Sequence, residues 1–356
     1  MMGTEQGSVS MEQLALLLAV SRMFGVLTYT GDSKLSSATG FLAILLSGVL
    51  QLLLLRLGIF LCGGLRGASM GAAKGPKSLY RVICGGYWLL CTAIAADTAE
   101  TFTRFLSVSF YDWKGWWALE LLFVVAAVLS ARQGIEAICR AAALLGVLLA
   151  GLFLLIAAGL WDEYNLLYYS FAPAPAAGML EGVLHGAAMN FEMIALLLLL
   201  PEAVNRHSPA RSRWVIWTTA AAAGVQTMLC LSLGMYAEGK TFPMFAAAAS
   251  AGFSVFQRLD AVFMAMWVIT GFLRISVFLL LSARLWPQLC LRERKKQDFY
   301  SQGLIIAGAA LFVGLCGSSL SFFESTAAAG AAVALGVILL PLAGRLVSRE
   351  KRGEEK

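Results

Sequence analysis

Charged side chains inside apolar stretches are the residues of this sequence best suited to ligand chemistry. Arg22, Glu192 and Arg274 each lie in a run of about twenty mostly hydrophobic residues, the length of a membrane span. A charge in the hydrocarbon of a bilayer costs at least about 2.5–3.5 kcal/mol, so such a residue is expected to face the protein interior and find a partner. We expect Arg22 to hold a ligand carboxylate or to pair with Glu192 at a ligand cavity. The alternative is a structural ion pair of Arg22 with Glu192 or Asp97.

Two further carboxylates, Asp97 and Glu100, are three residues apart and therefore share one face of a helix, with Thr98 beside them. Such a pair can hold an ammonium group, a proton or a cation. It can equally face structural partners on other helices, such as Arg274. Near the end of another stretch, Glu136 and Arg140 are four residues apart, a spacing that predicts a local ion pair.

Two of the apolar stretches contain an interruption: Ser21 to Gly25 in the first, and His185 to Asn190 in the sixth. An interrupted helix in a bilayer leaves backbone groups without partners, which is tolerated only where they line a cavity or hold a ligand. Two interruptions at corresponding positions indicate a transporter-type site near the midplane. The candidate ligand-binding residues at these interruptions are Arg22, Met23, Phe24, Gly25, Gly186, Asn190 and Glu192.

The composition predicts a membrane protein and excludes a soluble enzyme. The 356 residues are 59% hydrophobic and only 13% charged, with a mean hydropathy of +0.77. About ten spans are expected. They are residues 11–31, 36–62, 78–108, 114–131, 134–160, 178–201, 212–236, 256–286, 301–320 and 326–346. The seven cysteines form no C-x-x-C pair, and no nucleotide-binding loop or hydrolase motif occurs, so no metal, cofactor or enzymatic activity is expected.

The charge distribution predicts the orientation. Most of the 27 basic residues fall in loops on one side if the N-terminus is cytoplasmic, which favours cytoplasmic positions for both termini. Membrane topology and attraction to anionic lipid account for these basic clusters without nucleic acid. We expect a short cytoplasmic N-terminus at 1–10, one membrane domain at 11–346 and a basic cytoplasmic tail at 347–356. An even number of helices fits two inverted five-helix halves.

Several motifs, in their order and spacing, resemble those of the spore germination permeases, the B subunits of endospore nutrient-germinant receptors. The motifs are Gly134-Ile135-Glu136-Ala137-Ile138-Cys139-Arg140, Thr241-Phe242-Pro243, Arg258-Leu259-Asp260-Ala261 continuing to Trp267, Phe272 and Arg274, and the Leu200-Pro201 end of the sixth stretch. The resemblance spans nearly the whole chain. Two departures are the absence of a tryptophan in 36–47 and of a proline in 107–113.

The resemblance implies an all-α amino acid–polyamine–organocation (APC) fold of the LeuT type, with helices 1 and 6 broken. It implies a place in the inner membrane of a dormant spore, with a larger A-type membrane subunit and a C-type lipoprotein as partners. It also implies that a small nutrient, often an amino acid, binds between helices 1, 3, 6 and 8. Asp97, Thr98, Trp267 and Arg274 are the candidate residues on helices 3 and 8.

We therefore expect a germinant-receptor subunit that binds a nutrient at the midplane and triggers germination. One alternative is a proton- or cation-coupled secondary transporter of amino acids, which would share the fold and the site. A second alternative is a structural membrane subunit with a vestigial pocket.

Overall fold

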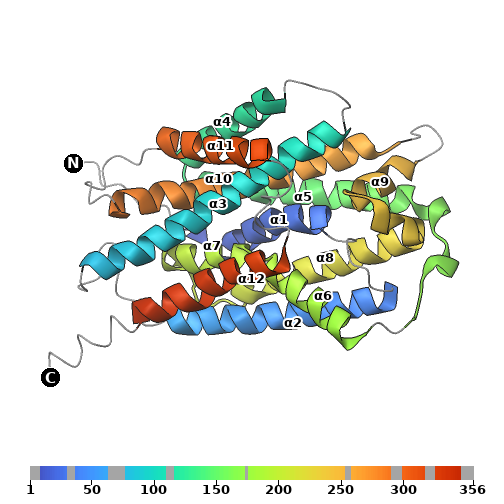
Figure 1. Ribbon diagram of the computed structural model, residues 1–356, viewed down its shortest axis with the longest axis horizontal. Helices are drawn as coiled ribbons and strands as arrows, with labels where there is room; N and C mark the ends of the chain where they lie inside the picture. The colour runs from blue at the N-terminus through green and yellow to red at the C-terminus, as the bar shows by residue number, and fades with distance from the viewer. Residues whose placement is uncertain are drawn as a thin grey trace.

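The computed structural model describes residues 9–29, 37–62, 77–109, 116–172, 175–252, 258–289, 299–316 and 325–345. Nearly all of them are helical, and the long helices run side by side along the long axis of the molecule (Figure 1). The cytoplasmic tail expected at 347–356 and most of the expected N-terminal segment lie outside the described residues.

The helices follow one another as the hydropathy predicts. The first five are α1 (Met11–Tyr29), α2 (Ser37–Cys62), α3 (Lys77–Ser109), α4 (Trp116–Arg132) and α5 (Ile135–Gly159). The others are α6 (Ala176–Ala188), α7 (Glu192–Leu199), α8 (Ala210–Ser232), α9 (Pro243–Ser250), α10 (Asp260–Leu289), α11 (Phe299–Cys316) and α12 (Thr326–Ala334), which continues through a π-helical turn at Leu335–Leu339. Two short strands, β1 (Val9–Ser10) and β2 (Ala203–Val204), pair in parallel.

Eight helical segments of the described residues are long and apolar enough to cross a membrane, and α6 and α7 together make one of them. The shorter α4 and α11 lie alongside α3 and α10 (Figure 1). Together these segments correspond to the ten predicted stretches. The short α9 begins at Pro243, which suits the first turn of a helix because proline lacks the N–H that would be unpaired there.

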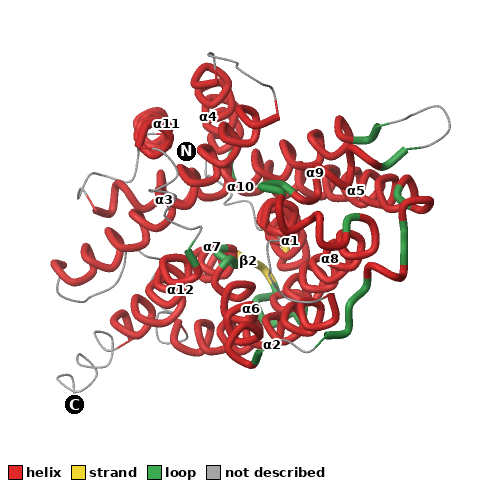
Figure 2. Tube along the Cα trace, turned by 45° about the vertical axis from the view of Figure 1, so that its right-hand side comes forward, coloured by secondary structure: helices red, strands yellow, loops and turns green. Residues whose placement is uncertain are grey.

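The helices differ in how deeply they are buried. In α1, 78% of the span is buried, and in α10 72%, whereas only 17% of the α5 span is buried. Figure 2 accordingly shows α1 in the interior of the bundle, with α2, α4, α5 and α11 towards its outside. Arg22 of α1 and Arg274 of α10 are both buried in the protein interior, where a charge needs partners from other helices.

The first span is not interrupted. α1 is helical from Met11 to Tyr29, which corrects the expectation of a break between Ser21 and Gly25. The polar residues of this stretch are accommodated by side-chain contacts, so its backbone keeps its helical hydrogen bonds. Gly25 provides space: a Cβ at this position would lie 2.6 Å from Nη1 of Arg22.

The sixth span is interrupted between Ala188, the last residue of α6, and Glu192, the first residue of α7. Residues 189–191 between them are not helical. The break is shorter than predicted and lies later in the chain, because His185 to Ala188 remain in α6. The last carbonyls of α6 and the first N–H groups of α7 thus end inside the bundle.

Candidate functional site

Glu192 connects the break to two other helices. Its side chain is fully buried, and Oε1 accepts a hydrogen bond of 3.1 Å from the Ser21 hydroxyl of α1. The same oxygen lies 3.4 Å from Nε of Arg274 on α10, so Arg274 is its ion-pair partner. A negative charge in the first turn of α7 also suits the positive end of the helix dipole.

Arg22 of α1 binds the α6 end of the break. Its guanidinium donates to the Met189 carbonyl and, at 3.4 Å, to the Gly186 carbonyl. These carbonyls lie at the C-terminal end of α6, where the helix supplies no further donors and a positive charge is favourable. The expected partner of Arg22 was the Glu192 carboxylate. The structure instead gives Arg22 hydrogen bonds to backbone carbonyls of the sixth span, and it pairs Glu192 with Arg274.

Arg274 lies close to two aromatic rings. Its Cζ is 5.5 Å from the ring centroid of Phe24 on α1 and 5.5 Å from that of Phe191 in the break, within the range of cation–π attraction. A Cβ at Gly25 would lie 3.4 Å from Nη1 of Arg274 and also close to Arg22, so the two guanidinium groups are neighbours.

Gln51 of α2 was not among the predicted site residues. It belongs to the buried polar cluster at the break, whose other members are Arg22, Asn190, Glu192 and Arg274. Its Nε2 donates to the Gly186 carbonyl at 3.1 Å, and its Oε1 accepts a bond of 2.6 Å from Nδ2 of Asn190. Gln51 is only 4% exposed. An amide in the middle of a mostly apolar 26-residue helix was the sequence signal for this residue.

Two buried acceptor atoms in the cluster have no hydrogen-bond partner in the part of the chain that the structure describes. They are Oδ1 of Asn190 and Oε2 of Glu192. Both residues are fully buried. Buried polar atoms are nearly always paired, and an unpaired one costs about 1–3 kcal/mol, so each of these oxygens is a favourable acceptor for a hydrogen-bond donor.

An aromatic cluster adjoins the charged residues. Trp267 donates from Nε1 to the Thr28 hydroxyl at 2.9 Å, and its ring lies 5.0 Å from that of Phe24 and 5.7 Å from that of Phe102. The Phe102 ring in turn stacks on Phe123 at 4.1 Å. The predicted site residues Phe24 and Trp267 are thus in contact with each other, beside Arg274.

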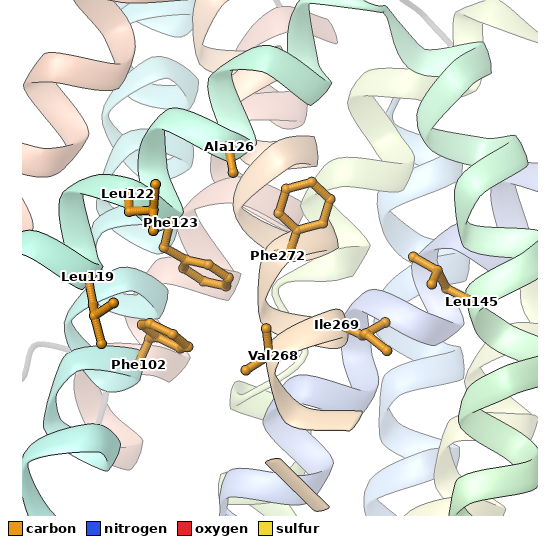
Figure 3. A pocket seen from close by; sticks show the side chains of 9 residues that line it. All are labelled: Phe102, Leu119, Leu122, Phe123, Ala126, Leu145, Val268, Ile269 and Phe272. Carbon is orange, nitrogen blue, oxygen red and sulfur yellow. The ribbon is translucent and has the colours of Figure 1, made fainter. Parts of the chain in front are cut away.

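Beyond these rings lies an apolar cavity of about 380 Å³ between α3, α4, α5 and α10 (Figure 3). Its lining residues are Phe102, Leu119, Leu122, Phe123, Ala126, Leu145, Val268, Ile269 and Phe272. None carries a polar side-chain atom, so this cavity suits hydrocarbon.

The remaining predicted residues have other surroundings. Thr98 is buried and donates to the Ile94 carbonyl within α3, next to the half-buried Asp97. Met23 is half-buried against the core. Glu100 lies 4.0 Å from Arg104 of its own helix.

Two other carboxylates have partners. Glu120 of α4 is 1% exposed and accepts a bond of 3.0 Å from the Thr103 hydroxyl of α3. The predicted local pair of Glu136 and Arg140 is confirmed.

A bundle of membrane spans in which one span is interrupted beside buried charges has the architecture of a transporter-type membrane protein. The structure is similar to that of a manganese transporter from Eremococcus coleocola, solved in complex with an aromatic bis-isothiourea substituted compound. The TM-score is 0.53 at 14% sequence identity, over 95% of this chain and 76% of the other. This likeness confirms the predicted APC-type fold.

The family follows from the sequence. A family model described as spore germination protein matches residues 9–314. The chain therefore belongs to the spore germination protein family and is an integral membrane protein of the permease type, not an enzyme. No curated protein matches the sequence.

Proposed function

We propose that this chain is the nutrient-binding membrane subunit of a germinant receptor and that it binds a small amino acid at the break between α6 and α7. The observation that carries this proposal is the buried, unpartnered oxygen of Glu192, whose other oxygen lies 3.4 Å from Nε of Arg274, together with a second such oxygen on Asn190 in the same break. An ammonium group is a donor of the kind these oxygens lack. A carboxylate is the natural partner of a guanidinium.

The geometry suggests how binding would produce a signal. Arg274 on α10 and Glu192 on α7 form an ion pair at 3.4 Å. A zwitterionic ligand offers each of them a new partner, so its binding would separate the two residues. Because the pair joins two different spans, its separation would favour another packing of α7 against α10 and shift the population between two states.

Site chemistry favours an amino acid over a metal ion. The cluster combines two guanidinium groups with one carboxylate and two amides. The positive charges repel a divalent cation. The fold shared with the manganese transporter therefore does not carry over to manganese as the ligand.

The proposed setting is the inner membrane of a dormant spore, with both termini cytoplasmic and with an A-type and a C-type subunit as partners. Membership of the spore germination protein family supports this setting. In it, the change of packing in this chain would be passed to the partner subunits and lead to release of spore ions.

Glu192→Gln tests the binding site. The variant keeps the size of the side chain but removes the charge that would hold the ammonium group. Because hydrogen bonds to charged groups contribute about 1.5–3 kcal/mol, the half-maximal nutrient concentration is expected to rise about tenfold or more. The measurement is dipicolinate release from spores, first screened against amino acids and sugars with a deletion strain to find the effective nutrient.

Glu136→Gln is the matched control, since Glu136 forms an exposed ion pair with Arg140 far from the break in the sequence. It is expected to leave the concentration dependence unchanged. Equal curves for wild type and Glu192→Gln, with both proteins present at equal amounts, would contradict the proposed site and favour a structural subunit with a vestigial pocket.

The second candidate function is secondary transport of an amino acid, which the transporter fold favours. It uses the same site and differs in whether the ligand crosses the membrane. Uptake of a radiolabelled amino acid into proteoliposomes separates the two functions. Concentrative uptake would support the transporter, whereas binding without flux would support the receptor.

A further inference from the structure

Backbone carbonyls at the end of an interrupted helix are a natural cation site. In transporters with interrupted spans, such carbonyls and the negative C-terminal ends of half-helices coordinate Na⁺ or accept a proton. In this chain the corresponding carbonyls are those of Gly186 and Met189, at the end of α6. Both accept hydrogen bonds from the guanidinium of Arg22.

We propose that Arg22 is a tethered cation that occupies this position, so that the site works without Na⁺ or K⁺. This inference rests on the proposed function only in placing the ligand at the break. It implies that ligand binding is not coupled to Na⁺ or K⁺, because the positive charge that neutralises the end of α6 is part of the protein and does not leave with the ligand.

The surroundings of Arg22 are built to hold it there. Gly25, one turn further along α1, has no Cβ, and a Cβ at this position would lie 2.6 Å from Nη1 of Arg22. Arg22 is only 7% exposed. A guanidinium stays protonated at any physiological pH, so its positive charge is permanent.

The carbonyl of Gly186 is already fully used. It accepts one bond from Nη2 of Arg22 and a second from Nε2 of Gln51, at 3.4 and 3.1 Å. A carbonyl oxygen has two lone pairs. The two donors therefore leave no lone pair on this oxygen for a metal ion as long as Arg22 is in place.

Thermal unfolding of the purified full chain in detergent, without nutrient, tests this proposal independently of the ligand. The wild-type unfolding temperature is expected to be the same in sodium, potassium and choline chloride of equal ionic strength. Arg22→Ala is expected to unfold about 4 °C lower or more, because it leaves the end of α6 without its cation. Na⁺ or guanidinium at a non-denaturing concentration should restore part of the loss, and choline, which is too large, should not.

Gly25→Ala provides a second variant that keeps Arg22 but displaces its guanidinium from the carbonyls. Its unfolding temperature is expected to become higher in sodium than in choline chloride. Arg140→Ala is the control, because Arg140 is an exposed partner of Glu136 and its loss should create no cation dependence.

Three results would overturn the proposal. One is a wild-type protein that is more stable in sodium than in choline chloride, since a separate cation site would then exist. Another is a folded Arg22→Ala protein that responds equally to guanidinium, Na⁺ and choline. The third, decisive if Arg22→Ala does not fold, is a Gly25→Ala protein indifferent to the cation. If the unfolding temperatures depended on the cation as expected but Glu192→Gln left the nutrient dependence of germination unchanged, only the proposed function would be contradicted.

Discussion

At the scale of single residues, the site depends on glycines that leave room for larger neighbours. Gly271 of α10 is the clearest case. A Cβ at Gly271 would lie 3.0 Å from both Cδ2 and Cε2 of Phe24, and 3.7 Å from Cζ of Phe123. The Phe24 ring lies 5.5 Å from Cζ of Arg274 and 5.0 Å from the ring of Trp267. The absence of one methyl group at Gly271 therefore sets how close the aromatic cluster lies to the charged residues.

Gly271→Ala is expected to destabilise the protein by about 1–3 kcal/mol, because the Phe24 ring must move in a packed interior. Thermal unfolding of the purified protein measures the change. Gly308→Ala on α11 is the control, since a Cβ there meets nothing within 4 Å and alanine favours a helix over glycine. If the two alanine variants were equally stable, Phe24 would not be fixed by its contact with α10.

The residues of the site were predictable only in part. Arg22, Glu192 and Arg274 could be identified because a charge in an apolar stretch is costly in a membrane unless the protein interior supplies a partner. Their pairing could not, because the sequence does not say that α10 brings Arg274 within 3.4 Å of Glu192. Gln51 was missed because an uncharged amide is a much weaker signal in a long apolar helix.

At the scale of elements, both interruptions were expected from polar and small residues within apolar stretches, and only one is a break in the helix. In the sixth span the backbone is interrupted at 189–191. In α1 a similar set of residues stays helical, because Arg22 and Ser21 reach partners through their side chains. Composition alone does not separate these two solutions, since both place polar groups inside a bundle.

The end of the sixth span and the segment that follows it contact three other elements, α10, α1 and β1. Nη1 of Arg284 on α10 lies 2.7 Å from both carboxylate oxygens of Glu202, which follows α7. Ser208 donates to Glu12 of α1 at 2.8 Å, and β2 pairs with β1, the segment that precedes α1. These contacts close the β1–β2 end of the bundle, which is the cytoplasmic end in the proposed topology.

Glu202→Arg and Arg284→Glu are each expected to weaken this closure and to increase germination without nutrient. An exposed ion pair is worth up to about 1 kcal/mol, so the expected increase is roughly two- to fivefold. The exchanged double variant should return towards the wild-type level, because the opposite charges face each other again. Spontaneous dipicolinate release measures the effect. If spontaneous dipicolinate release in the double variant rose by the sum of the two single increases, the pair would not contribute to closure.

At the scale of the whole molecule, the order and the lengths of the spans were predictable because they depend on hydropathy along the chain. Composition does not show which spans are neighbours, because every stretch is apolar. The contacts between spans join residues far apart in the sequence, such as Arg22 with Met189 and Trp267 with Thr28. The resemblance to a known family supplied the arrangement of helices that the pattern of residues alone does not contain.

The orientation of the bundle in the membrane is the remaining property that the charge distribution predicts. With both termini cytoplasmic, Glu163 lies on the outer side and Arg206 on the cytoplasmic side, and both are exposed in the structure. After replacement of the seven native cysteines, Glu163→Cys in intact cells is expected to react with a membrane-impermeant maleimide, and Arg206→Cys only after the membrane is made permeable. The opposite pattern would invert the topology. It would place the end closed by Arg284 and Glu202 on the side from which nutrient arrives, and nutrient would then have to open that closure to reach Glu192.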